Sequence, residues 1–218
     1  FDTIRAGALR ILEWSGATPL NNNSNLILPG NANLTTATGD LSIAVSDGGG
    51  VWRLMHHKFS GAGLGPVIGT PVASTSGTSI DFTGIPVWAK EISVSLVGVS
   101  TNGTSDLLIQ IGDSGGIETA TYLAASISND PGQSNYTTGF GIGNGSAAHV
   151  FHGTMVLKLE NATSFTWVAS GVFANSDAAR IVSAGGSKST SAALDRVRVT
   201  TVNGTDAFDA GEVNIQFL

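Results

Sequence analysis

Hydrophobic and polar positions alternate with a period of two over several short stretches of the chain. The clearest stretch is 151–159, where Phe, Met and Leu positions alternate with His, Thr and Lys positions. The same alternation occurs at residues 92–96, 107–111, 165–170 and 196–199. Successive side chains of a strand point to opposite faces of a sheet. Each stretch is therefore predicted to be a β-strand with one face toward a core.

Clusters of glycine, asparagine and aspartate separate these stretches. Such residues favour tight turns, and no helical periodicity of apolar residues interrupts the pattern. About ten short strands at this spacing are typical of two packed antiparallel sheets. The predicted fold is therefore all-β, an antiparallel β-sandwich of jelly-roll type. The main turn clusters are Asn102-Gly103, residues 113–116, residues 128–134, residues 143–145, Gly185-Gly186 and Asn203-Gly204.

The first 63 residues differ in texture, with shorter strands between glycine and asparagine. Such strands bury little surface alone, so this segment is expected to obtain part of its core from neighbouring chains. A Gly-rich link, 60–66, follows it, and the boundary is expected between 61 and 76. The prediction is a shaft or collar segment over 1–63 and a sandwich head over 72–218. The short strands are expected at 4–14, 25–29, 41–45 and 51–56.

Composition adds two constraints to this picture. Glycine accounts for 29 residues, and charged residues make up only 12% of the chain, about half the usual share. Soluble monomers keep a charged surface, so part of the apolar surface is expected to be buried between copies of this chain. The alternative is a monomer covered by Ser, Thr and Asn.

Charge and residue usage also exclude several function classes. The net charge of −6 and the lack of a basic patch argue against a nucleic-acid partner. The chain has no cysteine, so neither disulfides nor zinc–thiolate sites are expected. No apolar run approaches the ~18 residues of a membrane span, so no membrane insertion is expected. Because the chain opens at Phe1 without a signal peptide, we expect it to be a piece of a longer protein.

Three stretches resemble bacteriophage tail fibre proteins, and they occur in the order found in that family. The first resembles the unit that ends many fibre shafts, the second the opening of the fibre head domain, and the third the end of such heads. The first is LPGNANLTTATGD at 28–40 with GGVWR at 49–53; the second is SGTSIDFTGIPVW at 76–88, continuing through VSTNGTSD at 99–106 and IGDSGGIE at 111–118; the third is LDRVR at 194–198 with DAFDAG at 206–211.

This resemblance covers nearly the whole chain and implies a function in host adsorption. It implies a homotrimeric fibre tip, the end of the shaft plus a receptor-binding head, attached to the remainder of the tail fibre. The implied location is the virion, in the phage tail, after assembly in the host cytoplasm. The implied partner is a bacterial surface glycan or an outer-membrane receptor. Trp52 and Trp88 match framework positions of the family, which implies packing roles for both.

The segment 129–146 is the best candidate for a ligand site. It is polar and Gly-rich, and as a long loop it would be suited to recognition. Sugar sites combine an aromatic platform with amides and acids that bind hydroxyl groups, and this segment contains both. The alternative is that its rings fix the loop onto the sandwich or onto a neighbouring subunit. The candidate ligand-binding residues are Asn129, Asp130, Gln133, Asn135, Tyr136 and Phe140.

Two further aromatic residues could lie either in the core or at a ligand site. Trp167 alternates with Phe165 in a predicted strand and is therefore expected in the core. The role of Tyr122 stays open.

No catalytic residue and no cofactor are predicted. The acids fall mostly in turns, where they usually bind their own backbone, and Gly112-Asp113-Ser114-Gly115-Gly116 has the spacing of a nucleophile elbow without the helix that the elbow requires. Its glycines favour a hairpin turn instead.

The sequence offers two possible metal sites, and we predict neither. Asp206, Asp209 and Glu212 could offer oxygen ligands to Ca²⁺, but the six to eight oxygens of such a site are not evident. His56 and His57 point to opposite faces of a predicted strand, so one could face a three-fold axis and bind a transition metal.

The prediction from sequence is thus a non-enzymatic adhesin at the tip of a phage tail fibre. Two alternatives stay open at this point. One is a polysaccharide-degrading tailspike enzyme, which would need two acids in a cleft. The other is a structural collar that carries a different receptor-binding protein.

Overall fold

The computed structural model describes residues 4–58, 66–129 and 132–218, and it confirms the predicted all-β fold. Within these ranges there is no α-helix, and a single 3₁₀ turn, η1, covers Pro29–Asn31. The described part of the chain has no helix of the length and apolar character that a membrane span requires. The chain divides into two compact units, residues 1–67 and 68–218. The sequence placed this division between 61 and 76.

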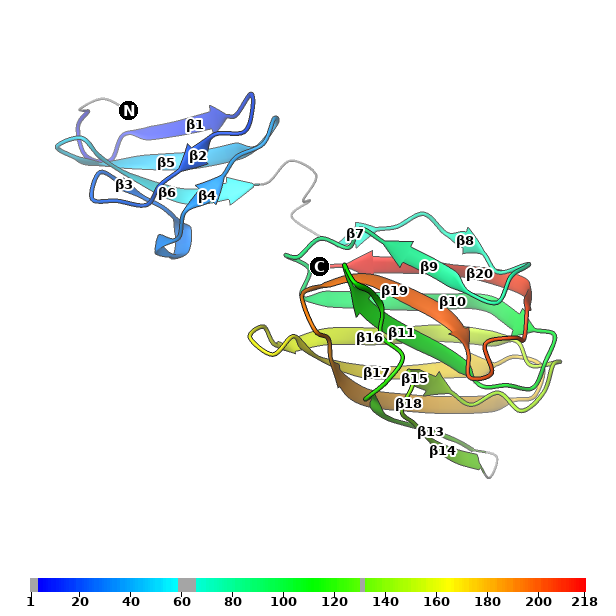
Figure 1. Ribbon diagram of the computed structural model, residues 1–218. Helices are drawn as coiled ribbons and strands as arrows, with labels where there is room; N and C mark the ends of the chain where they lie inside the picture. The colour runs from blue at the N-terminus through cyan, green and yellow to red at the C-terminus, as the bar shows by residue number, and fades with distance from the viewer. Residues whose placement is uncertain (1–3, 59–65, 130–131) are drawn as a thin grey trace. The chain divides into compact units, whose positions relative to one another are not determined.

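The first unit consists of a four-stranded sheet and a small two-stranded sheet (Figure 1). The strand order of the larger sheet is β1-β5-β6-β3. Strand β3 is parallel to β6, whereas the pairs β1–β5 and β5–β6 are antiparallel. The second sheet pairs β2 with β4. The strands are β1 (Leu9–Glu13), β2 (Pro19–Leu20), β3 (Leu26–Ile27), β4 (Leu34–Thr35), β5 (Leu41–Gly48) and β6 (Val51–Lys58).

One face of the four-stranded sheet holds the core of this unit. Leu54 and Ala44 are cross-strand partners on that face, and both are buried together with Trp52. Trp52 therefore has the packing role that the resemblance implied. Among the described residues of this unit, five hydrophobic ones are buried in this core, Leu20, Leu28, Ala44, Trp52 and Leu54. The unit consequently has a small core for its length.

The opposite face of the same sheet is apolar and exposed. Ile11 pairs with Ile43, and Leu9 pairs with Val45, so these side chains form one surface across β1 and β5. Ile11 is 70% exposed. We call this surface the aliphatic face of the first unit. Its large exposed side chains are Leu9, Ile11, Leu41, Ile43 and Met55.

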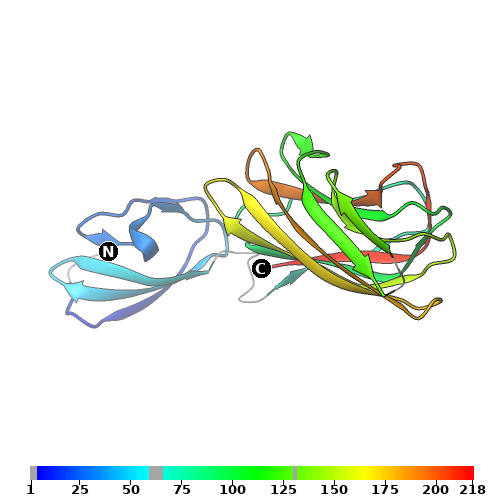
Figure 2. The same cartoon turned by 90° about the horizontal axis from the view of Figure 1, so that it is seen from below.

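The second unit is a sandwich of two sheets. The larger sheet has nine strands, with order β14-β13-β18-β17-β16-β10-β20-β7, and β8 also pairs with β20. The smaller sheet has order β12-β11-β19-β9, and β15 also pairs with β11. Apart from the short β7, each strand of the second unit is antiparallel to the strands with which it pairs. Figure 1 shows β9, β19, β11 and β15 lying over the larger sheet, and Figure 2 shows the two layers after a quarter turn.

The strands of the larger sheet include the stretches that alternate in the sequence. They are β7 (Val67–Ile68), β8 (Val72–Ala73), β10 (Glu91–Thr101), β13 (Leu123–Ser128), β14 (Gly132–Tyr136), β16 (Phe151–Asn161), β17 (Thr166–Asn175), β18 (Arg180–Ser189) and β20 (Phe208–Phe217). Those of the smaller sheet are β9 (Ile80–Thr83), β11 (Leu107–Asp113), β12 (Gly116–Ile117), β15 (Phe140–Ile142) and β19 (Leu194–Thr201).

A single hydrophobic core lies between the two sheets. In β10, Ile92, Val94 and Leu96 are fully buried, whereas the intervening serines face outward. One of these, Ser95, contacts Thr154 of the neighbouring strand at 3.1 Å between the hydroxyl oxygens. Burying each aliphatic side chain of this size contributes about 1.5–3 kcal/mol. The alternation therefore stabilises the sheet because it places every second side chain of β10 in the core.

Strand β11 is buried on both faces, unlike β10. Its inner side chains, including Ile109 and Ile111, face the larger sheet, and its outer ones are covered by the segment after β14. Gln110 donates a hydrogen bond from Nε2 to the carbonyl of Thr138 at 2.7 Å. This strand consequently holds the segment between β14 and β15 against the sandwich.

Two glycines allow β10 and β20 to pass each other closely at a bulge. Gly98 (φ +67°) and Gly211 (φ +90°) lie where the register between the two strands shifts. A Cβ atom on Gly211 would overlap the carbonyl group of Gly98. Both the backbone conformation and the packing therefore require glycine at 211.

Replacing Gly211 by alanine should destabilise the second unit by about 2–4 kcal/mol, because the substitution adds a steric overlap to an unfavourable φ. Gly204 has a similar φ of +68°, but a Cβ there would have nothing within 4 Å. Gly204→Ala should therefore cost only about 1–2 kcal/mol. Urea unfolding followed by circular dichroism measures both values, and equal losses for the two variants would contradict this explanation.

Candidate functional site

The segment expected to be a long loop contains two strands. Residues 132–136 form β14, which pairs with β13 in a hairpin at the edge of the larger sheet, and residues 140–142 form β15 in the smaller sheet. The prediction of a loop was therefore wrong for residues 132–136 and 140–142. Its Gly, Ser and Asn content concealed the strands, because those residue types are depleted from strands in general.

The two rings proposed as a sugar platform are in the core. Phe140 is fully buried, and its ring packs edge-on against Tyr122 with centroids 5.1 Å apart. Tyr136 is 6% exposed, and its ring lies so close to Gly141 that a Cβ there would overlap it. Phe140 offers no face to a ligand, and Tyr136, which lines a pocket of about 490 Å³ together with Tyr122 and Asn135, is almost wholly covered by its neighbours. The reason is that β14 and β15 bring them inward, where burial of a large aromatic surface is favourable.

The polar residues proposed for the site differ in their surroundings. The side chain of Asn129 accepts a hydrogen bond from the backbone N–H of Ile181 at 2.9 Å and thereby ties the hairpin to β18. Gln133 and Asn135 are exposed on β14. Asp130 lies outside the described residues.

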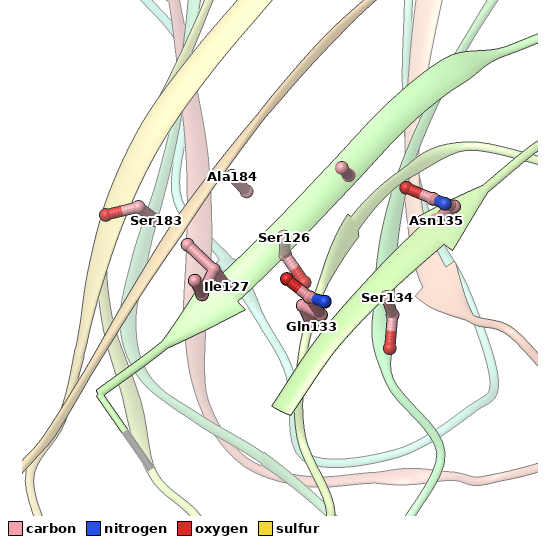
Figure 3. Close-up of a pocket in the computed structure, with 8 residues that line it drawn as sticks. Ser126, Ile127, Gln133, Ser134, Asn135, Ser183 and Ala184 are labelled. Carbon is pink, nitrogen blue, oxygen red and sulfur yellow. The ribbon is translucent and has the colours of Figure 1, made fainter. Parts of the chain in front are cut away.

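Gln133 and Asn135 line a pocket of about 620 Å³ on the hairpin, which we call the hairpin pocket. They point to one side of β14 and Ser134 points to the other, as Figure 3 shows. The pocket combines planar amides and hydroxyl groups with an aliphatic wall. The lining residues are Ala125, Ser126, Ile127, Gln133, Ser134, Asn135, Ser183 and Ala184. Its volume is within the range of small-ligand sites.

A second pocket of about 410 Å³ shares Ser126 and Ser134 with the first. We call it the arginine pocket because the side chain of Arg180, the first residue of β18, lies in its wall. It is more polar than the hairpin pocket and includes the only histidine among the two linings. Its lining residues are Asp106, Ser126, Ser128, Gly132, Ser134, Gly143, Asn144, Gly145, Ser146, His149 and Arg180.

Arg180 joins three segments at this pocket. Its Nη1 donates to the carbonyl oxygen of Asn144 at 2.5 Å, and its Nη2 donates to Ser128 Oγ at 3.0 Å. His149 Nδ1 lies 2.8 Å from the same Asn144 oxygen, which makes Nδ1 a donor. The guanidinium thus connects β18 with β13 and with the segment that follows β15.

Asp106 anchors the opposite wall of the arginine pocket. Its Oδ1 accepts from the backbone N–H of Asn144 at 2.6 Å, and its Oδ2 accepts from the Tyr136 hydroxyl at 2.8 Å. The same hydroxyl lies 2.9 Å from Ser126 Oγ. Burial raises the pKa of Tyr136, and the nearby Asp106 carboxylate raises it further. Tyr136 therefore stays a neutral donor to Asp106 and holds the pocket wall to the core.

A second cation of β18 shows how the fold neutralises a buried charge. Lys188, 4% exposed, lies 2.5 Å from Glu118 and donates to the Thr121 hydroxyl at 2.9 Å. Burial by itself raises the pKa of Glu118, but the hydrogen bonds from Lys188 and Ser191 outweigh it and lower the pKa overall. Lys188 also lies 5.5 Å from the centroid of the Tyr122 ring. Tyr122, left open by the sequence, is fully buried beside this ion pair.

Tyr122 also fixes the strand beneath it. Its hydroxyl donates to the Glu118 carbonyl at 2.9 Å and accepts from the backbone N–H of Ile111 at 2.8 Å. Because both partners are backbone groups, Tyr122 has a structural role here. Trp167 is likewise in the core, 3% exposed, as its strand position predicted. Trp88 is 38% exposed and packs against Phe217, with ring centroids 5.6 Å apart.

Two of the acids considered as calcium ligands, Asp206 and Asp209, accept hydrogen bonds from neighbouring protein groups. Asp206 accepts from the N–H of Ser105 at 2.9 Å and from Asn203 Nδ2 at 2.6 Å. Asp209 accepts a hydrogen bond from the Ser100 hydroxyl. In residues 4–58, 66–129 and 132–218, no three His, Asp or Glu side chains are grouped so that they could hold a metal. The side chains of His56 and His57 are outside the described part of the structure.

The Gly112–Gly116 motif is a hairpin turn. It joins β11 to β12, and Asp113 accepts hydrogen bonds from the Gly115 N–H at 2.7 Å and the Ser191 hydroxyl at 2.6 Å. These bonds, that from Ser191 first, lower the pKa of Asp113. The serine-elbow geometry, a strand followed by a helix, does not occur here.

Several pocket residues were not found from the sequence. Arg180 and His149 lie outside the segment 129–146, and the pairing of β13 with β18 brings Arg180 to the hairpin. One signal was available for the hairpin itself. Ser126 and Ser128 alternate with Ala125 and Ile127, which predicts a strand whose one face is polar.

Comparisons with protein-family models, with curated proteins and with solved structures found no match to this chain.

The rings of the hairpin should contribute to stability. Phe140→Ala should destabilise the second unit by about 3–5 kcal/mol, because it empties a core position. Tyr136→Phe removes only the hydroxyl and should cost about 1–3 kcal/mol, because the Asp106 carboxylate loses a partner. Thermal and urea unfolding measure both.

The exposed Gln133 is the matched control on the same strand. Gln133→Ala should change the unfolding free energy by no more than about 0.5 kcal/mol. If the Tyr136→Phe and Gln133→Ala variants had equal free energies of unfolding, the hydrogen bond between Tyr136 and Asp106 would not contribute to stability.

Proposed function

We propose that this chain is the receptor-binding end of a bacteriophage tail fibre, a homotrimeric adhesin that binds a glycan on the bacterial surface. The two adjoining pockets at the β13–β14 hairpin carry the proposal, since they combine amides, hydroxyl groups and an aliphatic wall in a volume that fits one or two sugar rings. The family resemblance in the sequence supplies the biological context. In this proposal, the hairpin pocket and the arginine pocket form one receptor site on each head.

Sugar recognition in this site would rest on hydrogen bonds rather than on ring stacking. Gln133 and Asn135 provide planar amides that can both donate to and accept from hydroxyl groups, and Ile127 provides apolar surface for a sugar's C–H face. A millimolar contact of this kind is worth roughly −4 kcal/mol. Three such sites on one fibre bind far more firmly, because the second and third contacts form at high effective concentration.

The aliphatic face of the first unit supports the homotrimer. Leu9, Ile11 and Ile43 are exposed on one face of a sheet whose other face already holds the small core. An apolar surface of this type is typical of a subunit interface. We propose that copies of this chain cover it, with the aliphatic faces of three chains packed around one axis.

Ile11→Glu should weaken this association, because it places a charge on the aliphatic face. Light scattering of the wild-type chain should give three times the mass of one chain, and the variant should shift toward a single chain as protein concentration falls. Arg10→Glu is the control, since Arg10 is also exposed but points to the other side of β1. A stable single-chain mass for the wild type would refute the homotrimer.

Binding of the fluorescent chain to a panel of bacterial strains, each with a mutant that lacks its surface polysaccharide, tests the adhesin. We expect binding to some strains and loss of binding to the matching mutants. The double substitution Gln133→Ala/Asn135→Ala should reduce cell binding about tenfold or more without lowering the unfolding temperature. Gln216→Ala on β20 should bind as the wild type does.

Two outcomes would count against the adhesin. Binding to none of the strains would favour the collar that carries another receptor-binding protein. Release of reducing ends from the purified polysaccharide would favour the tailspike enzyme.

A further inference from the structure

The arginine pocket contains a positive charge that no described acid neutralises. Four of the six Lys and Arg residues in residues 68–218 form ion pairs: Lys158 with Glu91, Lys188 with Glu118, Arg196 with Asp195 and Arg198 with Asp81. Lys90 is exposed and donates to the Val87 carbonyl at 3.2 Å. Arg180 forms no ion pair with any acid of the described residues. Its guanidinium contacts only the neutral oxygens of Asn144 and Ser128 and the His149 ring.

Unpaired polar atoms gather around the same side chain. Across the described residues, four buried side-chain polar atoms have no hydrogen-bond partner, and two of them, Arg180 Nε and Asn144 Oδ1, belong to residues that line the arginine pocket. A third, Asn175 Nδ2, belongs to the residue paired with Arg180 across β17 and β18. Buried polar groups normally have partners, because an unpaired one costs about 1–3 kcal/mol. Their concentration here points to a polar group that occupies the pocket.

The side chain of Asn144 has a fixed orientation, which makes this observation specific. Its Nδ2 lies 3.3 Å from the Gly103 carbonyl and 3.2 Å from the Ser105 carbonyl, so the amide cannot be flipped without losing both bonds. Asn144 is 2% exposed, and its Oδ1 accepts from nothing among the described residues. Two residues of the pocket lining therefore carry polar groups without a full set of partners, a buried amide oxygen on Asn144 and a guanidinium without an ion pair on Arg180, and this suits a ligand with both hydroxyl groups and a negative charge.

Asp106 narrows the choice of anion. Its carboxylate lines the same pocket, and both oxygens already accept hydrogen bonds from the protein. Arg180 and Asp106 together carry no net charge, so a singly charged carboxylate leaves less uncompensated negative charge in the pocket than a doubly charged phosphate does. A carboxylate also matches the planar fork of the guanidinium, which forms two parallel hydrogen bonds with such groups.

We infer that the arginine pocket binds the carboxylate of an acidic sugar, of the hexuronic acid class, with Arg180 as the residue that selects it. This inference deepens the proposed function and rests on it. Arg180 faces the carboxylate, whereas Ser128, Ser134 and Asn144 face the hydroxyl groups of the same ring. The hairpin pocket, which shares Ser126 and Ser134, holds the neighbouring neutral sugar of the chain.

Glucuronic acid and glucose are the probes, because they differ only in the carboxylate at C6. Their binding to the full chain is measured by saturation-transfer NMR titration. We expect glucuronic acid to bind about tenfold more tightly than glucose, as one charge-assisted bidentate contact predicts. Arg180→Gln should abolish that ratio while weaker binding of glucose persists. Equal affinity of the wild type for both sugars would overturn the inference, as would tighter binding of glucose 6-phosphate than of glucuronic acid.

Arg180 also holds the pocket together, so a second pair of variants tests the charge without removing it. Ser134 is exposed on β14 and lines the pocket. Ser134→Asp adds a negative charge and should lower the affinity for glucuronic acid about tenfold, whereas Ser134→Asn, of nearly equal size, should retain the preference. Equal effects of Asp and Asn at 134 on glucuronic acid would show that charge plays no part in this pocket.

Failure of this inference can be told apart from failure of the adhesin. If the chain binds cells through polysaccharide, but glucuronic acid does not compete and Arg180→Gln binds the same cells equally well, the acidic-sugar site is wrong and the adhesin stands. If the chain binds no strain at all, the proposed function fails first.

Discussion

The position of Tyr136 is the constraint on which the hairpin and both pockets depend. Its ring covers Gly141 of β15, and its hydroxyl bonds to Asp106, which in turn holds the backbone of Asn144. One side chain of the edge strand thus connects the larger sheet with the smaller sheet and with the segment after β15. An edge strand of five residues has few other contacts, and without this connection its geometry would not be fixed.

The sequence predicted the sandwich because alternation and turn residues agree along most of the second unit. Strands β10, β11, β16, β17 and β19 all occur where apolar residues recur with period two. Burial follows that period over 91–96 of β10 and over 166–170 of β17, whereas β11 is buried on both faces. The β13–β14 hairpin and β15 were missed for a physical reason. Their residues are small and polar, so strand structure there comes from pairing with neighbours rather than from intrinsic preference.

The candidate site was predicted only in part. The direction in which each side chain points decides which of the predicted residues line a pocket. Gln133 and Asn135 do line a pocket, whereas Tyr136 and Phe140 face the core. A segment interpreted as a loop has no regular alternation of inward and outward side chains. The sequence therefore does not distinguish the two exposed residues from the two buried ones. Arg180 could not be found at all, because its place beside Asn144 depends on contacts between residues 36 positions apart.

Alternation along β14 has a consequence for how such a protein can change over evolutionary time. Tyr136 faces inward and is tied to the sandwich, whereas Gln133 and Asn135 lie on the other side of the outermost strand and are exposed. Substitutions at the two outward positions alter the chemistry of the rim while the packing beneath stays intact. Substitutions that change the recognised ligand can therefore occur without affecting folding, although both kinds of position belong to one strand of five residues.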